Sequence, residues 1–220
     1  MDTVTALTHE ALLAMDQRKR AHLINSLGGF KSVCLIGSID SQQRTNLTIF
    51  NSIVHLGAHP PLVACIIRPD TAERHTLDNI LETQCYTINH LNESIYQKGH
   101  QTSARYHKTI SEFDAVGLTP EFRNPFLAPF VKESQVKLGL EFRQRVNIDL
   151  NGTILIIGEI VHVSFPTPCW HTDGYLDIEK AGTIAGSGLD SYHVTHRLKR
   201  LSYAKPDLPL TEISPDYLTR

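Results

Sequence analysis

Residues 136–165 read VKLGLEFRQRVNIDLNGTILIIGEIVHVSF and contain the clearest periodicity in the chain. From Val136 to Leu150 the even positions are apolar apart from Gln144, whereas the odd positions carry glycine, charged or amide residues. This alternation is typical of a long strand with one buried and one solvent-exposed face. The pair Asn151-Gly152 is a strong signal for a two-residue hairpin turn, and the run after it begins apolar on both faces. The stretch therefore predicts two long antiparallel strands.

Further apolar runs precede this hairpin. Strands are predicted at VCLIGSID (33–40), LTIFNSI (47–53), LVACIIR (62–68) and CYTINHL (85–91). The run at 62–68 is apolar on both faces, as an interior strand of a closed or covered sheet requires. His59 precedes a proline, which favours an extended backbone leading into that strand. Long antiparallel strands around a hydrophobic interior predict a mainly β fold, a barrel rather than an open doubly wound sheet.

Short helices are predicted at the periphery of this barrel. Residues 16–27 begin with Asp16 as an N-cap and end at two glycines, which predicts a short helix packed on a larger body. Residues 76–83 place their apolar side chains on one face and have His75 or Thr76 near the N-cap.

Two later segments have weaker patterns. Residues 92–103 are predicted to be helical. Residues 111–130 are predicted to be irregular because three prolines should exclude a regular element there: Pro120, Pro125 and Pro129.

The composition limits the class of protein. A chain of 220 residues with 41% hydrophobic content can form one domain with a substantial core, and we expect a single domain over 1–220 with an N-terminal extension (1–15) and a C-terminal arm (206–220). The net charge is -2 and no basic block is sustained, so nucleic acid is not an expected partner. Residues 1–30 contain no apolar run of signal-peptide or membrane-spanning length, so we expect a cytoplasmic protein without a membrane partner.

Cysteine and histidine spacing gives little support for a metal site. The four cysteines have no CxxC spacing, and we interpret them as small hydrophobic residues that are buried in the core. The segments HLGAH (55–59) and HVTH (193–196) have ligand-like spacing. Neither carries a helical apolar pattern or a matching acidic residue, so we predict no metal.

The segment TNLTIFNS (45–52) is a candidate ligand-binding stretch. The amide side chains of Asn46 and Asn51 both donate and accept hydrogen bonds, as the pyrimidine edge of a flavin would require. An edge strand whose Asn and Thr cap a turn has the same composition, and composition alone favours that alternative.

The segment RPDTAERHTLDN (68–79) is a candidate phosphate site. Arg68 follows a strand, and His75 and Thr76 lie at the start of a helix, so a guanidinium and a hydroxyl lie beside the positive end of a helix dipole. Ordinary capping by Thr76 with a surface arginine is an equally good interpretation of this stretch alone.

Three other features carry less weight. The glycine-rich segment 182–192 is neither a P-loop nor a dinucleotide fingerprint, so we interpret it as a tight loop that could touch a cofactor. His162 is more typical of a packed or solvated histidine than of a proton or hydride partner. The chain has no G-x-S-x-G elbow or paired-carboxylate signature, and no catalytic residue is assigned.

Taken together, these segments resemble the flavin reductase-like family of FMN-binding split barrels. The resemblance spans most of residues 17–205, and the ordered set is more specific than any one piece. The matching pieces are GS (37–38), NLTIFNS (46–52), HPPL (59–62), Arg68-Pro69, HTLDNI (75–80), YTIN (86–89), SEFDAVGLTP (111–120), ESQVKLGLEF (133–142), GEIVHV (158–163) and DGYLD (173–177).

The resemblance implies an antiparallel split barrel, dimeric, with FMN in a groove near the subunit interface. Residues 46–52 would face the isoalloxazine, with Asn46 among the cofactor-binding residues and Thr48, Ile49, Phe50 and Asn51 nearest the ring. Ser38 would support the ring or the ribityl chain. The phosphate would be held by Arg68, His75, Thr76 and Asn79.

The implied function is an FMN-binding oxidoreductase that uses NAD(P)H as co-substrate, a flavin reductase, with a redox protein as a further partner. The chain departs from the family pattern at Gly29–Ser32, where members often have Pro-Arg-Pro, and at Asn51, where serine is common. Gly158-Glu159-Ile160 stands where many flavin reductases have Gly-Asp-His. That departure favours an alternative, an FMN-carrying electron-transfer or sensor protein without nicotinamide turnover, and a flavin-free dimeric scaffold is a third.

Overall fold

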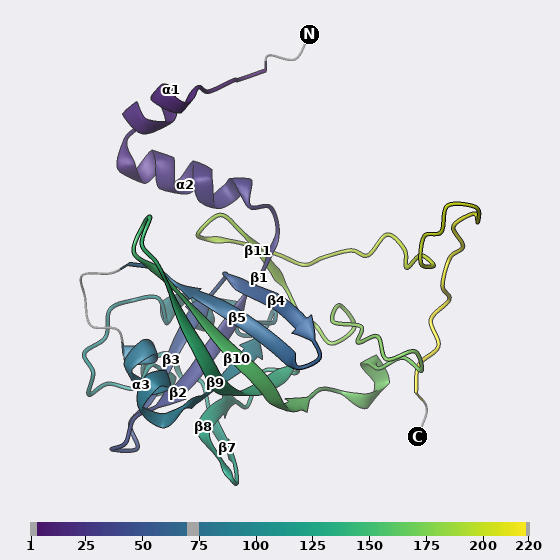
Figure 1. The fold of residues 1–220 in the computed structure, drawn as a ribbon. Coiled ribbons are helices and arrows are strands. Elements are labelled where there is room, and N and C mark those ends of the chain that lie inside the picture. Colours follow the sequence, from purple (N-terminus) through teal and green to yellow (C-terminus); the bar gives the residue numbers. More distant parts are fainter. Residues whose placement is uncertain (1–3, 70–74, 219–220) are drawn as a thin grey trace.

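The main structural unit is one antiparallel sheet that curls around a hydrophobic interior (Figure 1). The computed structural model describes residues 4–69 and 75–218, and within these ranges seven strands form this sheet in the order β3-β2-β6-β9-β10-β5-β4. The mainly β, antiparallel architecture predicted from the sequence is confirmed. The strands are β2 (Cys34–Ile39), β3 (Thr45–Phe50), β4 (Ile53–Ala58), β5 (Pro61–Ile67), β6 (Cys85–His90), β9 (Lys137–Ile148) and β10 (Thr153–Ser164).

The β2 strand is buried at every position because it separates two hydrophobic cores. Cys34 and Ile36 point into the barrel interior, where they join Tyr86 and other apolar side chains. Leu35 points to the opposite side and packs in a second core that includes Phe113. Side chains alternate across a strand, so two buried faces require a run that is apolar throughout.

The long hairpin of β9 and β10 is confirmed, but its turn is longer than the Asn-Gly signal predicts. Thr153 pairs with Ile148, which leaves the four residues 149–152 as the loop. The carbonyl oxygen of Ile148 accepts hydrogen bonds from the N–H groups of Asn151 (3.3 Å) and Gly152 (2.9 Å), and Gly152 has a φ of 72°. Glycine takes this left-handed conformation without a steric penalty, so it closes the turn rather than occupying its centre.

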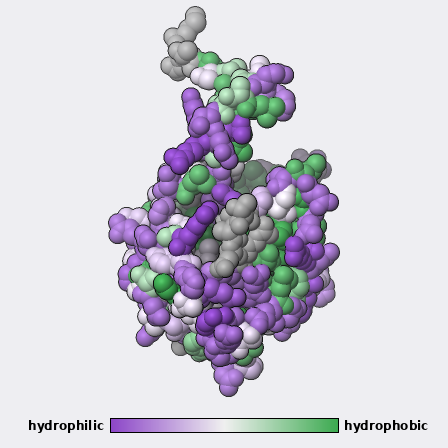
Figure 2. All heavy atoms as spheres, turned by 90° about the vertical axis from the view of Figure 1, so that its left-hand side faces the viewer, coloured by the Kyte–Doolittle hydropathy of each residue, from purple (hydrophilic) through white to green (hydrophobic). Residues whose placement is uncertain are grey.

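The helix predicted at 16–27 forms as α2 (Gln17–Leu27), preceded by α1 (His9–Ala14). Its cap is confirmed, since the Asp16 carboxylate accepts from the N–H groups of Arg18 (3.0 Å) and Lys19 (3.1 Å). The expected packing is wrong: α2 has no buried residue, and both helices project from the barrel (Figures 1 and 2). The hydrogen bond from Arg68 to Asn25 joins α2 to the barrel. Its apolar positions are too few to form a continuous buried stripe.

Residues 111–130 were expected to be irregular, and this prediction is wrong. They form α5 (Glu112–Val116) and a hairpin of β7 (Pro120–Arg123) and β8 (Phe126–Val131). Pro120 starts a strand and Pro125 lies in the turn. Pro129 lies where an irregularity shifts the register. Proline is tolerated at strand starts, turns and bulges, where no ladder N–H is needed.

The remaining elements surround the barrel. They are α3 (His75–Thr83), α4 (Tyr96–Gln101), the 3-10 helix η1 (Thr167–Cys169) and a small sheet of β1 (Lys31–Ser32), β11 (Ala185–Ser187) and β12 (Ser191–His193). Residues 194–218 swing away from the barrel and return near Trp170 (Figure 1), whose carbonyl oxygen accepts from the Leu218 N–H at 2.9 Å. The division into one domain, extension and arm stays a prediction.

All four cysteines are buried and free, as predicted. No helix in the described ranges is long and apolar enough to cross a membrane.

Candidate functional site

Two clefts meet along β3 and together form what we call the groove. The first cleft has a volume of about 350 Å³ and lies between the β3–β4 turn and residues 186–192. The second has a volume of about 360 Å³ and lies between β3, the start of α3 and residues 102–106. Both volumes fall in the range of small-molecule sites. The residues that line both clefts are Thr48, Phe50, Ile67 and Ser103.

The alternation of β3 decides which of its side chains reach the groove. Asn46, Thr48 and Phe50 lie on one face of the strand and line the second cleft. Leu47 points the other way into the second core. Ile49 packs against that core and also lines the first cleft. The strand therefore presents two hydrogen-bonding side chains and one aromatic ring to the groove.

A network of buried polar side chains lies behind this face. Glu112, at the start of α5, is 5% exposed, and its Oε2 accepts from Asn46 Nδ2 at 2.8 Å and from the Leu47 N–H at 2.9 Å. The Thr76 hydroxyl donates to Asn46 Oδ1 at 2.7 Å and lies 3.1 Å from the Thr48 hydroxyl. The network joins β3, α3 and α5 at the wall of the second cleft.

Ser38 and Asn79 lie behind the groove rather than on its surface. Asn79 Nδ2 donates to Ser38 Oγ at 3.2 Å, and Ser38 Oγ donates to Asn46 Oδ1 at 3.3 Å. Both side chains are buried and line neither cleft. Their direct contact with a cofactor stays a prediction. In the structure, these two side chains support Asn46 through hydrogen bonds.

The structure separates the predicted phosphate ligands. His75 and Thr76 line the second cleft, whereas Arg68 lines the first and donates from Nη2 to Asn25 Oδ1 of α2 at 2.8 Å. Residues 70–74, part of the predicted phosphate turn, lie outside the described residues. Arg68 therefore does not line the same cleft as His75 and Thr76.

The glycine-rich segment forms the far wall of the first cleft. It folds as the β11–β12 hairpin, and Asn51 Nδ2 donates to the carbonyl oxygen of Gly188 at 3.1 Å. The Tyr192 hydroxyl lies 2.7 Å from His100 Nδ1, which links this hairpin to α4. The segment predicted as a loop that could touch a cofactor therefore lines the groove.

Sequence reasoning missed Glu112. Burial raises the pKa of its carboxyl above the usual value, and the opposing effects of the Leu47 N–H, the Asn46 amide and His75 are smaller. A buried carboxyl with a shifted pKa in a cleft is a common mark of a functional site. The signal available in the sequence was Ser111-Glu112 at a helix start, which is also an ordinary cap pattern.

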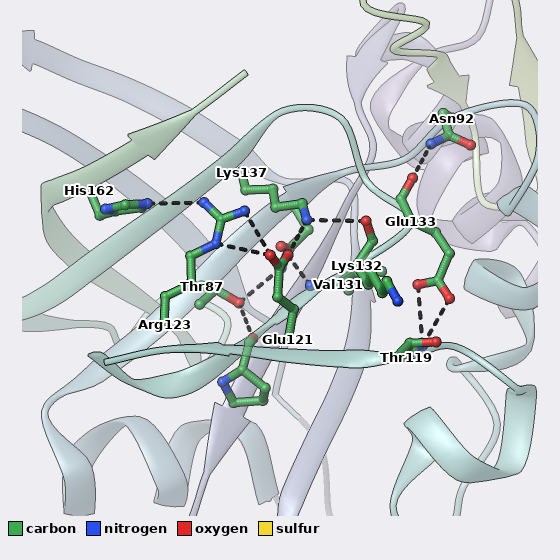
Figure 3. Close-up of polar contacts among 12 residues, drawn as sticks. Thr87, Asn92, Thr119, Glu121, Arg123, Val131, Lys132, Glu133, Lys137 and His162 are labelled. Carbon is green, nitrogen blue, oxygen red and sulfur yellow. Dashed lines mark hydrogen bonds and ion pairs between the residues drawn. The ribbon is translucent and has the colours of Figure 1, made fainter. Parts of the chain in front are cut away.

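A second polar cluster lies outside the groove, where β7 and β8 pack on β9 and β10 (Figure 3). Glu121 is paired with the buried Lys137, and with Arg123 at 3.0 Å. His162 Nε2 accepts from Arg123 Nη1 at 3.2 Å, because arginine can only donate, and its ring packs on Phe130. His162 lines neither cleft, which agrees with its interpretation as a packed histidine.

Comparison with known proteins identifies the fold family. Residues 30–178 match the model of the flavin reductase like domain. The chain belongs to the flavin reductase-like family. This flavin reductase-like chain is also similar to a split-barrel candidate flavin reductase from Shewanella frigidimarina NCIMB 400, with 50% identity, a TM-score of 0.88, and coverage of 91% of this chain and 100% of that one. The split-barrel fold predicted from the sequence is confirmed by this similarity.

More distant structures share the fold of this flavin reductase-like chain. Nitrilotriacetate monooxygenase component B from Bacillus cereus is 17% identical, with a TM-score of 0.79 and coverage of 91% of this chain and 100% of that one. The flavoredoxin of Desulfovibrio vulgaris (Miyazaki F) is 22% identical, with a TM-score of 0.67 and coverage of 81% and 92%. An uncharacterized protein of Aquifex aeolicus is 26% identical over 103 residues, 46% of this chain, and the match spans only about half of that protein (53%).

Proposed function

We propose that the groove binds FMN and that the protein is an oxidoreductase, an NAD(P)H-dependent flavin reductase. The observation that carries the proposal is the continuity of the groove in a chain of this family. Asn51 lies in the first cleft, Thr76 lies in the second, and Thr48 lines both. A single elongated molecule can therefore contact both ends.

The residues of the first cleft suit a flat heterocyclic ring. Ile49 and Phe50 offer apolar contact, while the amide of Asn51 and the backbone of residues 186–190 offer donors and acceptors. Small-molecule sites combine these features, a largely apolar lining with a few placed polar groups. The first cleft is thus the proposed ring position.

The residues of the second cleft suit an anion at its outer end. His75 and Thr76 lie in the first turn of α3, where backbone N–H groups and the helix dipole favour negative charge. Arg105 lines the same cleft. The FMN phosphate is the proposed occupant, with Arg68 on the rim of the first cleft.

Bound FMN would supply the redox chemistry, taking up hydride from a nicotinamide and passing electrons to an acceptor. The protein's part is to bind the cofactor, orient it and exclude water along β3. The residues proposed to do so, by contact with the cofactor or by supporting the residues that contact it, are Ser38, Asn46, Thr48, Ile49, Phe50, Asn51, Arg68, His75, Thr76 and Asn79.

A spectroscopic titration followed by anaerobic reduction tests this function. Purified protein should bind FMN with quenched flavin fluorescence, and NADH or NADPH should then bleach the visible absorption. Steady-state consumption of the nicotinamide with free flavin or oxygen as acceptor should follow. FMN-loaded protein that consumes neither nicotinamide would refute the reductase assignment.

An electron-carrying or sensing flavoprotein is the second candidate. Gly158-Glu159-Ile160 replaces the Gly-Asp-His pattern, and the Glu159 carboxylate is held by Arg143 at 2.7 Å on the exposed face of the β9–β10 hairpin. Photoreduction of bound FMN with electron transfer to a redox partner protein, and no oxidation of NAD(P)H, would favour this candidate. Protein that binds no flavin would leave only the scaffold alternative.

We also propose a homodimer. Large apolar side chains remain exposed on neighbouring parts of the sheet, namely Val54, Leu56, Val161 and Val163. Burying them against a second copy would remove apolar area from water. Sedimentation at micromolar concentration should give twice the chain mass, and a monomer under these conditions would contradict the proposal.

A further inference from the structure

We propose that Glu112 is a positioning residue that fixes the direction of a hydrogen-bond relay, so that the Thr48 hydroxyl accepts a hydrogen bond from a hydroxyl of the ligand's chain. The relay runs from Glu112 through Asn46 and Thr76 to Thr48. The identity of the ligand as a flavin with a polyhydroxylated chain rests on the proposed function. The direction of the relay rests on the chain's own residues.

The relay begins with an oxygen that can only accept. Two N–H donors, the Asn46 amide and the Leu47 backbone, converge on the same atom, Glu112 Oε2, at 2.8 and 2.9 Å. A carboxylate has no proton to donate. If Glu112 took up a proton, it would reside on Oε1, because Oε2 already faces two donors. Oε2 is therefore an acceptor in either state.

The Asn46 amide is consequently held in one of its two orientations. Its NH₂ group faces Glu112, and its Oδ1 faces the opposite side, where it accepts from Thr76 at 2.7 Å and from Ser38 at 3.3 Å. Asn79 donates to Ser38, so the Ser38 proton is directed to Asn46 as well. Both lone pairs of Oδ1 are used, and the residue is 6% exposed. If the Asn46 amide were flipped, its NH₂ group would face the hydroxyl protons of Thr76 and Ser38, and donors would face donors.

The direction passes to Thr48 because a hydroxyl has a single proton. The Thr76 hydroxyl donates its proton to Asn46 Oδ1. In the 3.1 Å hydrogen bond between the two hydroxyls, Thr48 must therefore donate and Thr76 must accept. Thr48 then has only lone pairs for the groove. A ligand atom at this position must bring an O–H or N–H, and a phosphate or carbonyl oxygen would be repelled.

The position of Thr48 selects the part of the ligand. It lines both clefts, so it lies where they meet. A ligand with its ring in the first cleft and its phosphate in the second places its connecting chain at Thr48. In FMN this chain carries hydroxyl groups, which are donors of the required kind. The relay thus favours a polyhydroxylated chain over a plain alkyl substituent.

A comparison of two flavins in the full-length protein tests the inference. Riboflavin carries the hydroxylated chain and lumiflavin has a methyl group in its place. We expect Thr48→Val to lower the ratio of the lumiflavin Kd to the riboflavin Kd roughly fivefold, the effect of one hydrogen bond. Thr48→Ser, which keeps the hydroxyl, should keep the wild-type ratio. Glu112→Ala should lower the ratio in the same direction but by less than Thr48→Val does, because Thr48 keeps its hydroxyl and loses only its fixed orientation. Glu112→Gln, whose amide oxygen can still accept, should keep the ratio.

The ratio separates a positioning role from a structural one. A general loosening of the groove would weaken both flavins equally and leave the ratio unchanged, which would overturn the proposal. A ratio lowered by Thr48→Val but not by Glu112→Ala would also overturn the role of Glu112. Thr45→Val is the matched control, because Thr45 is on the same strand, bonds Ser111 at 2.7 Å and lines neither cleft.

A measurement without flavin keeps the inference testable if flavin binding or the folding of Glu112→Ala fails. In isotope-labelled wild-type protein we expect a scalar coupling across the hydrogen bond from Asn46 Nδ2 to the Glu112 carboxylate carbon, and slow exchange of that amide proton. Absence of both signals would overturn the relay. Failure of wild-type protein to bind either flavin, with the coupling present, would refute the proposed function and leave the relay standing.

Discussion

The side-chain amide of Asn51 donates a 3.1 Å hydrogen bond to the carbonyl oxygen of Gly188, 137 residues later in the chain. This bond ties the turn between β3 and β4 to the β11–β12 hairpin. Both segments line the first cleft, so the bond sets the separation of its walls. Ser52 donates to Asn51 Oδ1 at 3.3 Å and holds the amide in place.

Asn51→Ala should therefore open the first cleft. We expect flavin binding to weaken by roughly three- to tenfold, because one hydrogen bond and its ordering of the loop are lost. Amide exchange in residues 186–191 should accelerate in the same variant. Asn147→Ala, at an exposed position on β9, is the control. Unchanged exchange in 186–191 would show that Asn51 does not hold the loop.

Glu112→Gln should change how stability depends on pH. Burial raises the pKa of Glu112 above its ordinary value of 4.5, so the folded chain binds this proton more tightly than the unfolded chain. The free energy of unfolding of the wild type, relative to Glu112→Gln, should fall as pH rises from about the ordinary value through the raised one. Denaturant melts between acid and neutral pH measure this difference.

The control for Glu112 is Asp114→Asn, which removes an exposed carboxyl from the same helix. A difference between wild type and Glu112→Gln that rises with pH would contradict the direction of the shift. Above the raised pKa the charged form costs stability, and we attribute its retention to the binding role of the site.

Lys137→Met should destabilise the β7–β8 hairpin by about 1–3 kcal/mol at neutral pH, because Glu121 loses its buried partner. Although burial raises the pKa of Glu121, the ion pairs with Lys137 and Arg123 lower it further, so its net pKa is depressed. The stability from this pair is present above the ordinary value of 4.5 and is lost as pH falls through the depressed pKa.

Thermal and denaturant melts of Lys137→Met should therefore approach those of the wild type in acid. Lys132→Met is the matched control, since Lys132 is exposed and contributes its backbone oxygen rather than its ammonium group to this cluster. A loss of stability that persists unchanged at low pH would point to packing of the lysine stem rather than charge.

The cysteines should be inert in the folded protein. Burial raises the pKa of the Cys34 and Cys65 thiols to about 12, so almost no thiolate is present at pH 8. Cys85 and Cys169 are also buried. A thiol reagent should label four sites per unfolded chain and react slowly with folded protein, at a rate set by unfolding. Rapid labelling of native protein would contradict this burial.

Local patterns predicted most of the barrel. The alternation from Val136 to Leu150 and the apolar run at 62–68 became β9 and β5, because strand pairing and burial follow directly from side-chain period. The Asp16 cap placed the start of α2 for a similar reason. The prolines of 111–130 led to a wrong prediction of irregular structure. Proline only lacks the backbone N–H donor, and whether a strand needs that donor depends on its partner strand.

Several of the residues proposed to bind the cofactor line one groove. They are Asn46, Thr48, Ile49, Phe50, Asn51, His75 and Thr76, and their contact with a cofactor stays a prediction. Arg68 lines the first cleft, whereas His75 and Thr76 line the second, and the Arg68 guanidinium bonds Asn25 of α2. Glu112 could not be predicted from local sequence because its burial depends on contact with β3. Its partner on that strand, Asn46, is 66 residues away in sequence.

The sequence by itself determined the main strands of the barrel and the Asp16 cap of α2, since each depends on neighbours within a few residues. The β7–β8 hairpin and the placement of α2 depended on contacts with distant parts of the chain. The tertiary structure decided that β3, α3, α5 and the β11–β12 hairpin meet along one groove. The direction of hydrogen bonds from Glu112 to Thr48 exists only once those elements are in contact, because a hydroxyl or amide has no fixed orientation until its partners are in place.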